Sequence, residues 1–131
     1  EHLLEPEGIT FEFHDDGRCP ELNDAFASAL YRSVRELIVN TIKHARPTRV
    51  VVSLGVDTGI LRVHVIDDGV GISSERAEQA LTGVGKTYGL FSVRERLHHL
   101  QGAFDITSSP GKGTRVTMKV PVLQPDKANI P

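Results

Sequence analysis

Polar and hydrophobic side chains alternate in five short stretches of the chain, and this period of two is typical of half-buried β-strands. The stretches are 9–13, 50–56, 61–65, 104–106 and 116–120. The turn residues Asp57-Thr58-Gly59 lie between the second and third stretch and predict a tight hairpin. We therefore expect five strands, two of them joined as antiparallel neighbours.

The longest helical signal covers residues 22–45. Its apolar positions recur at steps of three and four residues and form one face: Leu30, Val34, Leu37, Thr41 and Ala45. Pro47 helps to end this helix, because proline lacks the backbone donor that a helix interior needs. The pattern thus predicts one long amphipathic helix between the first two strands.

Two shorter helices are expected later in the chain. One covers 73–81, with Ser73 or Ser74 as its cap, and the other covers 90–100 and stops at Gly102. The order of elements is then β-α-β-β-α-α-β-β. This order predicts an α+β fold, a two-layer α/β sandwich with a mixed, mostly antiparallel sheet and helices on one face.

The composition is that of one globular domain spanning residues 1–131, with 123–131 as a C-terminal tail. The formal net charge is −2, which gives no electrostatic attraction for nucleic acid or for an anionic membrane surface. Neither is expected as a direct partner. Cys19 is the single cysteine, which excludes an internal disulfide and fits a reducing compartment.

No apolar run approaches the roughly 18 residues of a membrane span, and no signal peptide is evident. We therefore expect a cytoplasmic domain. The chain begins with Glu1 rather than Met, which leads us to expect a piece of a longer parent protein.

Gly85-Lys86-Thr87 closes a pattern similar to a phosphate-binding P-loop. A P-loop needs a buried strand before its glycines, and here the preceding residues are polar and helix-prone. The one strand–Asp junction suited to a Walker B partner comes before this loop, not after it. The structural context of a P-loop is therefore missing, and phosphate binding is expected elsewhere.

Glu36, Asn40, Lys43 and His44 share one face of the predicted long helix, at about 100° per residue. We expect this stripe to lie opposite the apolar stripe. A solvated polar face is one interpretation. Asn40 favours another, because asparagine is a poor residue in the middle of a helix. A carboxylate and an amide one turn apart, followed by two basic side chains, offer oxygen ligands to Mg²⁺ and donors to phosphates.

Asp67 continues the alternation of the third strand and so points to its buried side, where a carboxylate needs a donor. It is either a turn residue that caps local backbone or an acceptor for an exocyclic amino group such as that of adenine. Gly69 and Gly71 would let a flat ring approach the backbone. Residues 109–114 form either a plain hairpin loop or a floor beneath a nucleotide.

Four segments in this order resemble the motifs of the Bergerat-fold ATPases, which include gyrase, Hsp90, MutL and histidine kinases. YRSVRELIVNTIKHA resembles the N box, VIDDGVGI and YGLFSVRERL the two Gly boxes, and SSPGKGTRVTMKVP the closing segment. The resemblance covers about residues 22–122. It is strongest to the ATP-binding catalytic domain of sensor histidine kinases of the NarL-partnered type.

The resemblance implies ATP and Mg²⁺ as cofactors. It implies that Asn40 holds Mg²⁺, that Glu36 orients the metal's water shell or assists phosphoryl transfer, and that Lys43 and His44 face the phosphates. Asp67 would accept the adenine amino group. The remaining residues that shape the ATP pocket would be Gly69, Gly71, Gly85, Gly89, Leu90 and Thr114.

By the same resemblance, residues 73–89 would form a lid over the phosphates, and Lys86 would lie in that lid. Two positions depart from the family pattern. Asp68 stands where Asn is more usual, and Thr87 stands where many relatives have a glycine.

The phosphoacceptor histidine of such kinases lies on a separate dimerising helix, and no histidine here has that sequence context. The resemblance therefore implies a catalytic domain that donates the γ-phosphoryl group to a dimerisation domain, with a response regulator as an indirect partner. Residues 1–7 would be the end of that helix or a linker. A membrane anchor elsewhere in the parent protein is compatible with this interpretation. The alternatives are an anti-sigma-type serine kinase and an ATP-sensing module without catalysis.

Overall fold

A computed structural model describes residues 8–82 and 90–122 of the chain. It contains eight elements in the predicted order. They are β1 (Thr10–Asp15), α1 (Asp24–His44), β2 (Arg49–Asp57), β3 (Ile60–Asp67), α2 (Ser74–Thr82), α3 (Leu90–His99), β4 (Ala103–Ser108) and β5 (Thr114–Pro121). The expected tail at 123–131 and the expected linker at 1–7 lie outside the described residues.

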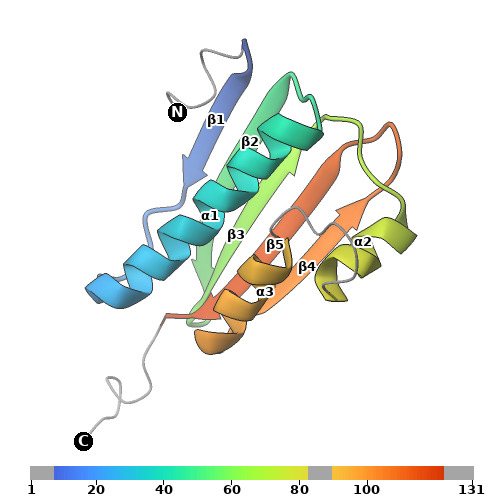
Figure 1. The fold of residues 1–131 in the computed structure, drawn as a ribbon. Helices are drawn as coiled ribbons and strands as arrows, with labels where there is room; N and C mark the ends of the chain where they lie inside the picture. Colours follow the sequence, from blue (N-terminus) through green and yellow to red (C-terminus); the bar gives the residue numbers. More distant parts are fainter. Residues whose placement is uncertain (1–7, 83–89, 123–131) are drawn as a thin grey trace, which may run out of the picture.

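The five strands form one sheet in the order β1-β2-β3-β5-β4 (Figure 1). β1 runs parallel to β2, and every other neighbouring pair is antiparallel. The hairpin between β2 and β3 turns through Thr58 and Gly59, both with positive φ, as a two-residue turn requires. The predicted fold class, with a mixed and mostly antiparallel sheet, is confirmed.

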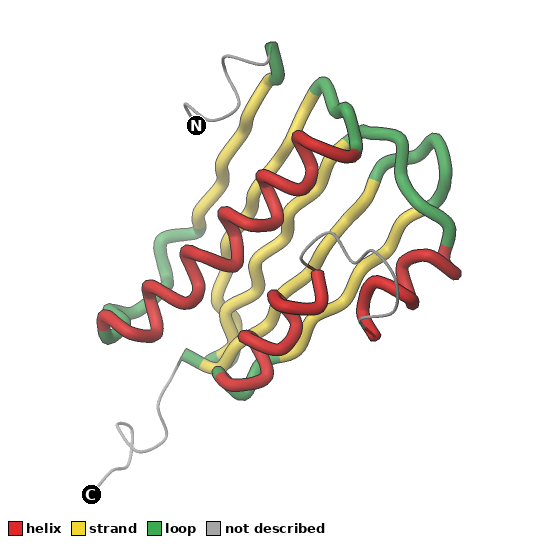
Figure 2. The backbone as a smooth tube through the Cα atoms, in the orientation of Figure 1, coloured by secondary structure: helices red, strands yellow, loops and turns green. Residues whose placement is uncertain are grey.

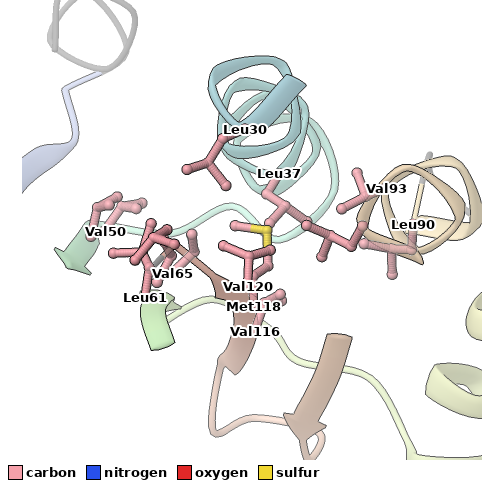
Figure 3. Close-up of a cluster of buried hydrophobic side chains, with 14 of the residues drawn as sticks. Leu30, Leu37, Val50, Leu61, Val65, Leu90, Val93, Val116, Met118 and Val120 are labelled. Atoms are coloured by element: carbon pink, nitrogen blue, oxygen red, sulfur yellow. The ribbon is translucent and has the colours of Figure 1, made fainter. Parts of the chain in front are cut away.

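The helices cover one face of the sheet (Figure 2), and the core fills the space between these two layers (Figure 3). Its strand residues come from alternating positions, as predicted: Val50, Val52, Leu61, Val63, Val65, Val116, Met118 and Val120. Leu37 of α1 and Leu97 of α3 meet them from the helical layer. Burial of these apolar side chains is the main stabilising contribution to the fold.

The long helix begins two residues later than its apolar pattern alone predicts. The side chain of Asn23 accepts the backbone N–H of Phe26 at 2.8 Å and so caps the first turn. At the other end Ala45 caps the helix, and Arg46 takes a positive φ directly before Pro47. Within residues 8–82 and 90–122, no helix is both long enough and apolar enough to cross a membrane.

Candidate functional site

A cavity opens at the end of the helical layer where α1 finishes and β3 ends. Apolar side chains from five regions of the chain form much of its wall, among them Leu37, Ile72, Leu90, Ile106 and Val116. The cavity has a volume of about 170 Å³ and is open to solvent at its mouth. Its apolar walls suit an apolar part of a ligand, such as a ring system.

Six polar side chains also line this cavity. They are Asn40, Thr41, His44, Asp67, Arg76 and Thr114. Four of them were singled out from the sequence, although they come from α1, β3 and β5 and lie up to 74 positions apart in the chain. The fold therefore brings most of the predicted site residues together.

The polar stripe of α1 does not lie opposite its apolar stripe, so that expectation was wrong. Asn40 and His44 line the same cavity as Leu37. Seven residues turn a helix by about 700°, which places His44 only about 20° from Leu37 around the axis. Asn40 and His44 instead lie at the edge of the apolar face of α1, near the end of the helix, where this face lines the cavity.

The other two members of the stripe do not reach the cavity lining. Lys43 is exposed near the end of α1. Glu36 directs its carboxylate to Arg96 of α3, with Oε1 lying 3.2 Å from Nη1. Leu90 forms part of the apolar wall, whereas Gly85 and Gly89 lie outside the described residues.

Asp67 is a carboxylate in a nearly water-free position at the end of β3. It is 7% exposed and points to the helix-covered side of the sheet, as the alternation predicted. The backbone N–H of Gly69 donates to its Oδ1 at 2.7 Å. Burial raises the pKa of this carboxyl above its ordinary value, the Gly69 donor partly opposes that rise, and the charge of Asp68 adds to it. The backbone of Thr114 also lowers this pKa, and a further donor from a bound ligand would stabilise the ionised form.

Gly69 and Gly71 serve close packing of the protein itself. A methyl group on Gly69 would overlap the carbonyl of Ala45, and one on Gly71 would overlap the carbonyl of Ser109. Gly71 also has a φ of 71°, which favours glycine. These glycines thus let the segment after β3 fit between α1 and the 109–113 loop. Gly71 also lines the cavity, and the expectation that the two glycines admit a ring stays a prediction.

Ser108 holds the floor of the cavity together and was missed by the sequence analysis. Its Oγ accepts the N–H of Ile72 at 2.8 Å and lies 2.8 Å from Oγ1 of Thr114. It also lies 3.0 Å from the carbonyl oxygen of Gly113. The available signal was its position, since a hydroxyl continues the inward-facing alternation of Phe104 and Ile106.

Asp68, which departs from the family pattern, joins the end of β3 to the start of β2. Its Oδ1 accepts the backbone N–H groups of Thr48 at 2.8 Å and Arg49 at 3.0 Å, and its Oδ2 accepts the Thr48 hydroxyl at 2.5 Å. These donors, the Thr48 hydroxyl first, lower the pKa of Asp68. A carboxylate has acceptor oxygens for all three donors, whereas an asparagine has only one oxygen.

Arg76 is a second residue that the sequence analysis missed. It lies in the first turn of α2, which Ser73 caps by accepting the Arg76 N–H at 3.2 Å. Its side chain is exposed and lines the cavity. Nothing in the local pattern distinguishes it from the other polar residues of this short helix, because the contact arises only from how α2 packs.

Gly85-Lys86-Thr87 lies outside the described residues, so only the segment before it bears on the P-loop interpretation. Residues 74–82 form α2, so a helix stands where a P-loop requires a buried strand. The strand that ends in an acidic pair is β3, which precedes α2 in the chain. The features expected of a nucleotide site, a buried acceptor and apolar walls, are found at the Asp67 cavity instead.

The family model for histidine kinase-, DNA gyrase B- and HSP90-like ATPases matches residues 26–124. The chain is 34% identical over 98 residues to the sensor histidine kinase LiaS of Bacillus subtilis, covering 75% of this chain and 26% of that protein. It is 35% identical over 101 residues to the sensor protein VraS of Staphylococcus haemolyticus, covering 76% of this chain and 27% of that protein. The chain thus spans about a quarter of the length of these curated relatives.

Solved structures show the same fold. The histidine kinase domain of the Erythrobacter litoralis EL346 blue-light activated kinase superposes with a TM-score of 0.77 at 25% identity, over 96% of this chain and 57% of that one. The catalytic domain of histidine kinase ThkA gives a TM-score of 0.77 at 18% identity, over 92% and 83%. The chain therefore belongs to the histidine kinase-, DNA gyrase B- and HSP90-like ATPases, and it is homologous to the catalytic domains of sensor histidine kinases.

Proposed function

We propose that this domain binds ATP in the Asp67 cavity and donates the γ-phosphoryl group to a histidine on a dimerisation domain. The observation that carries the proposal is a buried carboxylate at the end of a cavity with apolar walls. Membership of an ATPase family that includes histidine kinases supports the same conclusion.

Adenine recognition would depend on Asp67. Its Oδ1 already accepts the Gly69 N–H, and a carboxylate has further acceptor positions. The adenine amino group would donate to one of these, while Ile72 and Val116 of the cavity wall exclude water from the ring. The geometry of the turn fixes the carboxylate before the nucleotide arrives, which limits the entropy lost on binding.

The phosphates would lie toward Asn40, His44 and Arg76. Arg76 brings a permanent positive charge to the cavity, and His44 brings one when it is protonated. Lys43, exposed beside them, is placed to approach the phosphates from solvent. This group of donors suits a polyphosphate better than it suits a neutral ligand.

The residues present also fit Mg²⁺. No group of three or more His, Cys, Asp or Glu side chains within the described part of the chain is arranged to hold a metal. Mg²⁺ needs no such group, because it keeps several waters and is commonly bound by few protein oxygens together with substrate phosphates. Asn40 would supply the protein oxygen. When bound, the metal neutralises phosphate charge.

The acceptor histidine is proposed to come from another domain. His64 lies on the sheet face that the helices leave uncovered, where its ring is 3.1 Å from the Thr117 hydroxyl. His98 and His99 lie at the exposed end of α3, and none of these three lines the cavity. A response regulator of the NarL type and a cytoplasmic location remain predictions; the likeness to LiaS and VraS does not confirm the NarL-partnered subtype.

Two measurements test this proposal. In calorimetry with Mg²⁺, the chain should bind ATP about tenfold to over a hundredfold better than ITP, because ITP has a carbonyl where adenine has its amino group. Equal affinities would contradict the assignment of Asp67. With γ-labelled ATP and a histidine-bearing dimerisation domain added as a separate chain, label should appear on that histidine and not on residues 1–131. Label on serine would favour the anti-sigma-type kinase, and binding without transfer would favour a sensing module.

A further inference from the structure

Arg96 of α3 contacts two residues on one turn of α1, and none of these side chains lines the proposed nucleotide site. Its Nη1 lies 3.2 Å from Glu36 Oε1, and its Nη2 lies 3.5 Å from Oε2. Nη1 also donates to Ser33 Oγ at 3.3 Å, and this hydroxyl donates to the carbonyl of Ala29 at 3.0 Å. A single guanidinium thus connects two residues of α1 to α3.

This cluster is not an ordinary surface ion pair. Ser33 is fully buried, and the side chain of Arg96 is only 19% exposed, whereas that of Glu36 is 40% exposed. Two parallel contacts fix the relative orientation of guanidinium and carboxylate, which a single exposed contact would not do. Removing either partner leaves a polar group in a partly buried position without its main contact.

The cluster is adjacent to residues that shape the cavity. Glu36 precedes Leu37 of the cavity wall and stands one helical turn before Asn40. Leu90, the first residue of α3, lines the same cavity. Leu37 and Val93 lie between the two helices, which pack side by side (Figure 3). A change in how α1 meets α3 would therefore move Asn40 relative to Leu90.

We propose that Arg96 is a positioning residue for the nucleotide site: through Glu36 and Ser33 it fixes α1 against α3 and so sets Asn40 and Leu90 at the correct separation. Glu36 then acts through Arg96 and not on the metal or the phosphates, because its carboxylate is directed to the guanidinium and the residue does not line the cavity. The inference rests on the proposed nucleotide site, and it replaces the direct role that the resemblance implies for Glu36.

The test is a double-mutant cycle on the 131-residue chain, with ATP binding measured by calorimetry in Mg²⁺ and in EDTA. Glu36→Gln and Arg96→Met should each weaken binding in Mg²⁺ about tenfold. The double variant should bind no more weakly than the weaker single variant, since all three lack the carboxylate–guanidinium ion pair. Binding in EDTA should change less, because Asp67 is untouched. General loss of packing would lower both affinities alike, and that result would overturn the inference.

Arg62→Met is the matched control, because it makes the same chemical change on the uncovered face of the sheet; it should bind ATP like the wild type. Arg96→Lys keeps the positive charge but cannot make two parallel contacts with the carboxylate, and it should bind ATP with intermediate affinity. If Arg96→Met does not fold, Arg96→Lys takes its place in the cycle. Loss in Glu36→Gln with wild-type binding in the Arg96 variant would show direct action of Glu36 and overturn the inference.

Losses that multiply in the double variant would also overturn the inference. If the proposed nucleotide site is wrong, the experiment gives a different result. The wild-type chain would then not bind ATP, or Asp67→Ala would bind it as well as the wild type. Either result would contradict the proposed function together with the inference that rests on it.

Discussion

The backbone N–H of Gly69 donates to Oδ1 of Asp67 at 2.7 Å, so the turn that follows β3 holds its own buried carboxylate in place. A second hydrogen bond joins this turn to the end of α1, because the Val70 N–H donates to the carbonyl of Ala45 at 2.8 Å. The acid that we assign to adenine recognition is therefore oriented by backbone, and few side-chain changes would reorient it.

Asp67→Asn should change how stability depends on pH in the absence of nucleotide. Burial raises the pKa of Asp67, so the unfolded chain loses this proton at lower pH than the folded chain does. The contribution of Asp67 to stability is thus full below the ordinary carboxyl pKa and falls as pH rises through the raised value. The melting temperature of the variant minus that of the wild type should increase between about pH 3 and about pH 7. A difference that stays constant would show that burial does not shift this carboxyl.

Gly71→Ala should be much more destabilising than Gly111→Ala. Both glycines have positive φ, but only at Gly71 would the added methyl overlap a neighbour, the Ser109 carbonyl. Urea unfolding should show a loss of about 1 kcal/mol for Gly111→Ala from backbone strain alone. For Gly71→Ala the loss should be about 3 kcal/mol, because overpacking is added to strain. Similar losses would mean that the 109–113 loop moves aside freely.

Asn40→Ala should weaken ATP binding mainly when Mg²⁺ is present. If Asn40 supplies the protein oxygen to the metal, its removal should cost about tenfold or more in Mg²⁺ and little in EDTA. Thr41→Val is a suitable control, since Thr41 lines the same cavity but its hydroxyl donates to the Leu37 carbonyl of its own helix. Equal losses with and without metal would assign Asn40 a packing role.

Lys86→Ala should keep most of the ATP affinity, within about threefold of the wild type by calorimetry. In a P-loop this lysine would contact the β- and γ-phosphates, and its removal would nearly abolish binding. The helix α2 upstream argues against that arrangement. A loss as large as that of Asp67→Ala would restore the P-loop interpretation.

The period of hydrophobic residues predicted the strands and the long helix, and the serine cap marked the short polar helix α2, so that the order of the elements followed. Alternation also placed Asp67 on the buried side, because a strand has only two faces and its neighbours Val63 and Val65 define one of them. Local chemistry explains the small errors. The helix α1 begins at Asp24 because Asn23 caps it, and the apolar pattern contains no sign of that cap.

The parts that could not be predicted depend on contacts between distant segments. Arg76 reaches the cavity only through the packing of α2, and the Arg96 contact with Glu36 joins helices 60 positions apart. The close packing of Gly69 and Gly71 could not be predicted either, since their neighbours Ala45 and Ser109 come from other parts of the chain. Periodicity identifies which face a residue occupies, but not which segment it will meet there.

The most direct test of the account is the ATP affinity of Asp67→Ala, measured by calorimetry beside its melting temperature and its affinity for ITP. Loss of a hydrogen bond to a charged acceptor, about 1.5–3 kcal/mol, predicts ATP affinity reduced about tenfold to over a hundredfold. The fold should remain intact, and the preference for ATP over ITP should disappear. A folded Asp67→Ala variant that binds ATP as tightly as the wild type would contradict the account.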